Sequence, residues 1–204
     1  MGTSHELLFI TVPPPRSGNI VEFLADLQDV VEAVAVYTDI DVVALVKRND
    51  NSVTSTISKI ENLGLPIENV ERCKIDDVIV GPSARKGRSQ GHSSFFAFVR
   101  CAINTELTDF EFALQRLSKI ASVRFIYPSK ERSEIILQII SSDKITFDKQ
   151  IMSDVQNIGG MVRFSKARTN MLFGASSRQI RETYPNIISH VNAWMESSSF
   201  LILN

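Results

Sequence analysis

The chain has 204 residues, of which 44% are apolar and 22% charged, so it can bury one large core or two small ones. Its 22 Lys and Arg nearly balance its 23 Asp and Glu. The net charge of -1 excludes a global positive field that would attract nucleic acid or an anionic membrane. The two cysteines, Cys73 and Cys101, have no disulfide framework or metal-ligand spacing. Without a signal peptide or long apolar run, the sequence predicts a soluble, cytoplasmic protein with reduced thiols.

The first 81 residues predict six elements in the order strand, helix, strand, strand, helix, strand. They fall at 5–12, 20–27, 34–38, 42–46, 53–63 and 70–80. The turn Asp39-Ile40-Asp41 makes the two central strands a hairpin, and Gly64 suits a left-handed cap at the end of the second helix. This order is that of a split βαβ, or ferredoxin-like, unit, in which two helices cover one face of a four-stranded antiparallel sheet.

Residues 82–93 are rich in Ser, Gly and basic side chains, so they predict a flexible basic linker. Residues 94–174 then repeat the order of elements. The second set falls at 95–103, 110–117, 123–127, 135–140 and 147–158, with a last strand ending at 173. Residues 175–204 predict a C-terminal helix and an apolar tail, which we expect to pack on the second unit or on another subunit.

Three short segments recur in the same order in the two halves, which indicates a duplicated unit. Residues 19–23 resemble 108–112, residues 58–64 resemble 153–159, and residues 77–81 resemble 170–174. The predicted fold class is therefore α+β, with two tandem ferredoxin-like units, 1–81 and 94–174, forming an α/β-barrel-like pair. The uncovered sheet faces must be buried within the chain or by oligomerisation, as a dimer or higher.

Catalytic and metal-binding motifs are missing from the sequence: it has no phosphate loop, Rossmann glycines, HExxH or nucleophile beside a histidine. His5, His92 and His190 fall in the first strand, the linker and the tail helix, so a shared metal or acid–base site is not expected. The carboxylate pairs at 76–77 and at Asp39 and Asp41 have solvated turns as their ordinary explanation. We predict a protein that is not an enzyme and has no catalytic residue, metal or cofactor.

The segment from Leu27 to Gly81 resembles the effector-binding (RAM) domain of the Lrp/AsnC regulators. Its core is the pair of valine-rich strands across 34–46, joined by a corner at which Asp41 falls on the family's aspartate. Thr38 stands near the family's glycine, and in the second copy Glu134 stands near the aspartate position. The resemblance extends to both copies without a helix-turn-helix, because the first predicted strand begins within the first ten or so residues.

This resemblance implies a non-catalytic sensor of an amino acid or similar small metabolite, with ligand sites near the strand-to-strand corners. Such a sensor would act in transcription regulation through a partner, for example a DNA-binding regulator, rather than by binding DNA itself. Ligand contacts are expected from both corners. The candidate residues are Tyr37, Thr38, Asp39 and Asp41 in the first copy and Arg132 and Glu134 in the second.

Three alternatives are compatible with the same pattern of elements; the last of them, an enzyme on this scaffold, would require an ionisable pair buried in a pocket. ACT domains share the order and bind amino acids at the first strand-to-helix turn, which is Ser17-Gly18-Asn19 here. A ligand-free interaction module would use its sheets and tail only to assemble oligomers or hold a partner. A plain hairpin turn at Tyr37–Asp41 would fit the second alternative, whereas binding sensitive to Gly18 would fit the first.

Overall fold

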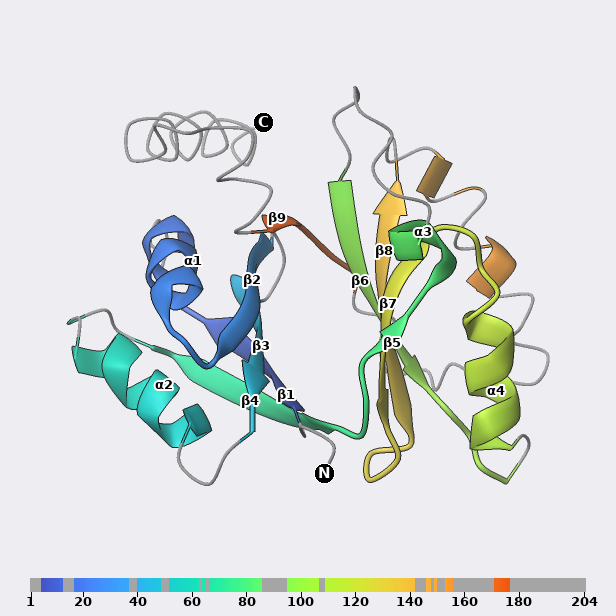
Figure 1. Cartoon of the computed structure of the whole chain (residues 1–204), viewed down its shortest axis with the longest axis horizontal. Coiled ribbons are helices and arrows are strands. Elements are labelled where there is room, and N and C mark those ends of the chain that lie inside the picture. Colours follow the sequence, from blue (N-terminus) through green and yellow to red (C-terminus); the bar gives the residue numbers. More distant parts are fainter. Residues whose placement is uncertain are drawn as a thin grey trace. The chain divides into compact units, whose positions relative to one another are not determined.

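The computed structural model describes most of the first 141 residues and several segments beyond them (Figure 1). The described residues are 5–12, 17–36, 40–48, 52–62, 64, 67–85, 95–106, 109–141, 146–147, 149, 153–155 and 171–176. The chain forms two units, which we name by their main segments: the N-terminal unit (mainly Glu6–Arg72) and the C-terminal unit (mainly Cys73–Gly174). The predicted tail helix lies outside the described residues.

The N-terminal unit contains an antiparallel sheet in the order β4-β1-β3-β2 and two helices. Its elements are β1 (His5–Thr11), α1 (Ser17–Asp26), β2 (Val30–Val36), β3 (Val42–Lys47), α2 (Ser52–Asn62) and β4 (Asn69–Ile75). The predicted hairpin is confirmed, because β2 and β3 pair antiparallel with Val34 opposite Val43. Gly64 has a φ of 69°, so the predicted left-handed conformation after the second helix is confirmed as well.

The core of the N-terminal unit lies between the two helices and one face of its sheet. Buried side chains of the helices, such as Ile20 and Leu24 of α1 and Ile60 of α2, pack against alternate residues of the strands. The strand residues in this core are Leu8, Ile10 and Val12, Ala33 and Ala35, and Val42, Ala44 and Val46. The i, i+4 spacing of the helix residues and the period of two in the strands are the patterns on which the sequence prediction rested.

The C-terminal unit repeats this strand arrangement and adds one short edge strand. Its elements are β5 (Ile79–Val80), α3 (Pro82–Arg85), β6 (Phe95–Ala102), α4 (Phe110–Leu117), β7 (Val123–Ser129), β8 (Glu134–Ser141) and β9 (Met171–Ser176). The strand order is β9-β6-β8-β7-β5. The pairs β6–β8, β7–β8 and β6–β9 are all antiparallel. Its core contains Phe110, Ala113 and Leu117 of α4 with strand residues such as Val99 and Leu137.

The strand predicted at 70–80 is divided in the structure. It bends at Asp76, whose N–H donates to Pro128 O at 2.9 Å and whose Oδ2 accepts from Lys130 N at 2.6 Å. After the bend, β5 pairs with β7. A Cβ on Gly81 would lie 2.4 Å from Val123 O, so only glycine allows this close approach to the backbone.

The predicted linker at 82–93 begins with α3, and its residues after Arg85 lie outside the described part of the chain. The boundary between the two units falls earlier, between Arg72 and Cys73 within β4. In the part of the chain that the structure describes, no helix is long and apolar enough to cross a membrane.

Candidate functional site

Asp41, the predicted corner residue, joins the β2–β3 hairpin to β1. Its N–H donates to Ile10 O at 3.0 Å, and its side-chain Oδ2 accepts from Val12 N at 2.9 Å. Asp41 O in turn accepts from Val36 N at 2.8 Å. The Asp41 side chain therefore stabilises the backbone at this corner. Three other predicted contacts, Tyr37, Thr38 and Asp39, lie outside the described residues, and the predicted role of this corner in ligand binding stays untested.

Burial raises the pKa of Asp41, against the opposing effect of the Val12 N–H and with a smaller contribution from the charge of Glu68. Because the folded protein holds this proton more tightly than the unfolded chain, the charged carboxylate opposes folding. Stability falls as the pH rises from the ordinary value of 3.8 through the raised pKa.

Asp41→Ala is expected to destabilise the protein by about 1–3 kcal/mol, because it removes the acceptor of the buried Val12 N–H. Asp41→Asn keeps an acceptor and removes the charge, so its stability relative to wild type is expected to improve as the pH rises through the raised pKa. Urea unfolding of both variants between pH 3 and pH 7 measures this. An Asn variant as unstable as the Ala variant at pH 7 would show that the carboxylate charge itself is needed.

The ACT-like alternative placed a site at the first strand-to-helix turn. In the structure these residues, Ser17 to Asn19, form the first turn of α1. The helix therefore begins earlier than predicted. Its first-turn side chains are not among those described, so this site is also untested.

The two candidate residues of the second copy, Arg132 and Glu134, lie in different surroundings. Arg132 is exposed in the turn between β7 and β8, whereas Glu134 is buried at the start of β8. Glu134 forms a two-pronged ion pair with Arg100 of β6, with 2.7 Å between Nε and Oε1 and 3.0 Å between Nη2 and Oε2. The two side chains are only 13% and 12% exposed.

Arg100 was not predicted as a site residue. The signal in the sequence was a lone arginine inside the apolar run Phe95–Ile103, where a cation must find a partner if the strand is buried. Its partner could be identified only from the pairing of β6 with β8, which brings Glu134 diagonally opposite.

Arg100 and Glu134 belong to a sheet face with an unusual composition, which we name the polar face. It is the side of the β6-β8-β7 sheet that points away from the core residues Val99 and Leu137, as the alternation along each strand requires. Its buried members are Phe98, Tyr127, Ser129, Glu134, Ile136 and Gln138, with Arg100 largely buried beside them.

Aromatic rings and a second arginine complete the polar face. The Tyr127 ring stacks on Phe98 with 6.5 Å between centroids and lies 6.4 Å from the Phe125 ring. The Arg124 guanidinium lies 4.9 Å from the centroid of Phe125, and its Nη1 donates to Gln138 Oε1 at 3.4 Å. The polar face thus carries a cation and aromatic rings on each of β6 and β7, with a carboxylate and an amide on β8 between them.

The buried part of the corresponding sheet face in the N-terminal unit is apolar, with Glu32 and Lys47 only at its less buried ends. On strands with the same places in the sheet order it carries Leu7, Phe9, Val34, Val36, Val43 and Leu45, all buried. Burying charged and amide groups costs free energy that aliphatic side chains do not incur. The difference between two faces of matching topology marks the polar face as the candidate site.

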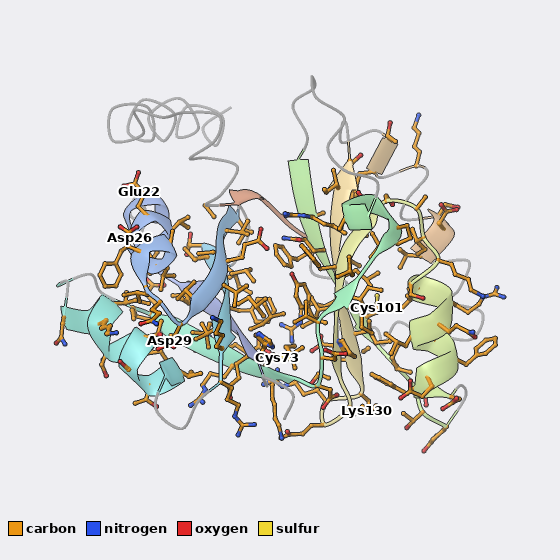
Figure 2. All side chains as sticks on the ribbon, viewed as in Figure 1. Glu22, Asp26, Asp29, Cys73, Cys101 and Lys130 are labelled. Carbon is orange, nitrogen blue, oxygen red and sulfur yellow. The ribbon has the colours of Figure 1, made fainter. Side chains whose placement is uncertain are left out.

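Cys73 lies on β4 (Figure 2) and interacts with Ser129 of the polar face. The pKa of the Cys73 thiol is raised, chiefly by burial and also by the charge of Glu134. The Ser129 hydroxyl and the charges of Arg132 and Arg100 act in the opposite direction and lower the pKa. The Ser129 hydroxyl is itself buried and makes no hydrogen bond of standard geometry. Burial also raises the pKa of Cys101, to about 12.

Both thiols are therefore expected to resist alkylation in the folded protein. At pH 8 a thiol with a raised pKa has little thiolate, which is the nucleophile, and Cys73 and Cys101 are fully buried. Mass spectrometry after iodoacetamide treatment should find no adduct in native protein and two adducts in urea. Rapid modification of native Cys73 would show that the polar face opens readily near Ser129.

Among the residues that the structure describes, no group of three or more His, Cys, Asp and Glu could hold a metal ion. The polar face therefore offers cation, carboxylate, amide and aromatic groups. Such a set suits recognition of a flat ligand with carboxylates, because guanidinium binds carboxylate through two parallel hydrogen bonds and aromatic rings stack on planar rings.

No family model and no curated protein matches the chain. Among solved structures, the siroheme decarboxylase NirDL matches with a TM-score of 0.57 at 7% identity, covering 92% of this chain and 79% of the other. The chain shares its ferredoxin-like fold. A mutant chlorite dismutase from Candidatus Nitrospira defluvii matches with a TM-score of 0.54 at 11% identity, covering 86% of this chain and 93% of the other.

These similarities correct two predictions. The chain was predicted to be a non-catalytic metabolite sensor like the Lrp/AsnC effector domain, and not an enzyme; the structural neighbours are enzymes instead. The error has a physical origin, since the alternation of strands and helices specifies a fold that serves many unrelated functions. The sequence resemblance to the Lrp/AsnC domain is not tested by these comparisons.

Proposed function

We propose that this chain is an enzyme that acts on a tetrapyrrole with carboxylate side chains, and that decarboxylation is its class of reaction. The observation that carries the proposal is the fold shared with a siroheme decarboxylase over 92% of the chain. The polar face supplies the place for such a substrate, because its buried charges have no counterpart on the matching face of the N-terminal unit.

The groups on the polar face have the chemistry that this substrate needs. A tetrapyrrole carboxylate would bind Arg100 in the two-pronged geometry that Glu134 now adopts, so Glu134 occupies the place of a substrate carboxylate. The Phe98 and Tyr127 rings offer planar surfaces for the macrocycle. Tyr127 is 1% exposed and Gln138 is fully buried, so binding must be accompanied by opening of this face.

The iron of siroheme would come with the substrate. A protein ligand to such an iron is ordinarily His, Cys thiolate, Met or Tyr. Burial raises the pKa of both cysteine thiols and so disfavours the thiolate, and His5, the one histidine among the described residues, lies at the first position of β1. The polar face therefore offers Arg100 for a substrate carboxylate and, of the ordinary iron ligands, Tyr127.

The proposal includes the finer prediction that the two units are tandem copies. It is supported by the three recurring sequence segments and by the matching strand orders β4-β1-β3-β2 and β9-β6-β8-β7. After such a duplication, one copy could keep an apolar face for stability while the other acquired the charged groups of a site.

Titration of the purified chain with siroheme, followed by absorbance and then by mass spectrometry of the ligand, tests the proposal. We expect a shifted absorption band and a product that has lost CO2. The double variant Arg100→Met/Glu134→Leu should fold and bind at least about tenfold more weakly, since a charge-assisted pair contributes about 1.5–3 kcal/mol. Arg116→Ala, which removes an exposed guanidinium on α4, is the matched control and should behave as wild type.

The outcomes test the ligand class, its binding site and the reaction separately. If wild type gives no absorbance change with siroheme, the tetrapyrrole proposal is wrong. If the double variant binds as tightly as wild type, the ligand does not bind at Arg100. Binding without loss of CO2 would retain the ligand class and reject the reaction.

A further inference from the structure

Ser129, the last residue of β7, has a buried hydroxyl that the polar face does not satisfy. The residue is fully buried, and its Oγ makes no hydrogen bond of standard geometry with any residue that the structure describes. By contrast, Glu134 pairs with Arg100, and Gln138 accepts from Arg124. Because a buried hydroxyl without a partner costs free energy, the presence of this one needs an explanation.

The neighbours of this hydroxyl identify the group within its reach. Ser129 lies directly opposite Glu134 in the pairing of β7 with β8, so the two side chains are on the same face of the sheet. Opposite residues of an antiparallel pair have Cβ atoms about 4.5–5.5 Å apart, which lets a serine hydroxyl reach a glutamate carboxylate. The Cys73 thiol interacts with Ser129 and is also under the charge of Glu134, so the hydroxyl and the carboxylate share one environment.

We propose that Ser129 is a positioning residue for a carboxylate ligand: its hydroxyl takes up Glu134 when a ligand carboxylate takes Arg100. Both oxygens of Glu134 are held by Arg100 in the ligand-free protein, at 2.7 Å and 3.0 Å. A ligand carboxylate that binds the same guanidinium fork displaces them, and a carboxylate with only 12% side-chain exposure then needs another donor. A serine hydroxyl supplies one donor, and its hydrogen bond to an ionised acceptor is stronger than one to a neutral group.

A purely structural role does not account for this hydroxyl. Alanine would occupy the same buried position without an unsatisfied donor, and the Cys73 thiol that interacts with Ser129 is a weak hydrogen-bonding group. The inference rests on the proposed carboxylate site, because it names the residue that lets Arg100 exchange Glu134 for a ligand. It also makes a prediction for the ligand-free protein, which can be tested whether or not the ligand is a tetrapyrrole.

The test compares the effect of Ser129→Ala on urea unfolding in three backgrounds: wild type, Arg100→Met, and Arg100→Met/Glu134→Leu. Arg100→Met reproduces the loss of the arginine from Glu134 without any ligand. In wild type, Ser129→Ala should change the folding equilibrium constant less than about threefold, because it removes a hydroxyl that has no partner. In Arg100→Met it should lower that constant at least about tenfold, the size of a hydrogen bond to a charged group. In the double variant, which has no carboxylate at 134, the effect should be small again.

Ser118→Ala is the matched control, because it removes a hydroxyl bonded to Gln115 O at the end of α4 and should cost the same in all three backgrounds. If Arg100→Met does not fold, Arg100→Lys replaces it. An ammonium cannot form the two-pronged contact, so a Glu134 oxygen is left for Ser129, and Ser129→Ala should still cost severalfold more than in wild type. The proposal is overturned if Ser129→Ala costs the same with and without Arg100, or if its larger cost persists after Glu134 is removed.

Titration with siroheme then separates this proposal from the tetrapyrrole proposal. Ser129→Ala should bind siroheme about tenfold more weakly than wild type. Ser129→Thr, which keeps a hydroxyl, should bind nearly as tightly as wild type. If wild type does not bind siroheme, the tetrapyrrole proposal is wrong, and the unfolding comparison still decides the role of Ser129. If wild type and Ser129→Ala bind siroheme equally, the proposed role of Ser129 is overturned.

Discussion

Glu134→Ala is expected to lower the free energy of unfolding by about 3–5 kcal/mol, one of the largest effects of any single substitution in this chain. The reason is the burial of its partner. Arg100 is 13% exposed and loses both of its contacts with the carboxylate, at 2.7 Å and 3.0 Å, so a cation is left desolvated without that counter-ion. Urea unfolding followed by circular dichroism measures the change.

The double variant Arg100→Met/Glu134→Leu is the informative companion. Apolar side chains of similar volume need no counter-ion, so this variant should recover most of the lost stability. Glu111→Ala breaks the ion pair of Glu111 with Lys130, whose side chains are 58% and 61% exposed, and serves as the surface control with a much smaller effect. A loss for Glu134→Ala as small as that of the control would mean that water reaches Arg100 in the folded protein.

Most elements of the fold could be predicted because each depends on local patterns. The apolar spacing of α1 and α4, the hairpin of β2 and β3 and the left-handed Gly64 all follow from contacts within a few residues along the chain. The division of the predicted strand at 70–80 could not be predicted. It depends on Asp76 bonding to Pro128 and Lys130, which are distant in sequence and meet only in the folded unit.

The candidate site was less accessible to sequence reasoning than the fold. Glu134 was predicted as a ligand contact because it stands near the corner aspartate position of the Lrp/AsnC resemblance, whereas the structure pairs it with Arg100, 34 residues earlier. That pair depends on the register of β6 against the neighbouring β8, which places Arg100 opposite Ile136. A shift of one residue would turn the arginine into the apolar core, so no property of either residue alone predicts the pair.

Leu24→Ala and Leu117→Ala, one in each unit, are each expected to cost about 2–5 kcal/mol. Both side chains are almost fully buried, at 0% and 1% exposed, and they belong to different cores, Leu24 from α1 and Leu117 from α4. Removing three heavy atoms from either core leaves a cavity that the packed neighbours only partly fill. Thermal unfolding of the two variants gives the size of the loss.

Which unit loses protection against hydrogen exchange is more informative than the size of the loss in stability. If the two cores are separate cooperative units, hydrogen exchange should accelerate mainly in Glu6–Arg72 for Leu24→Ala and mainly in Cys73–Gly174 for Leu117→Ala. A uniform acceleration in both variants would show that the units unfold together, as one cooperative domain. If the units unfold separately, the polar face can open while the N-terminal unit stays folded, and a large planar substrate can enter. If they unfold together, opening the polar face costs as much free energy as unfolding the whole chain.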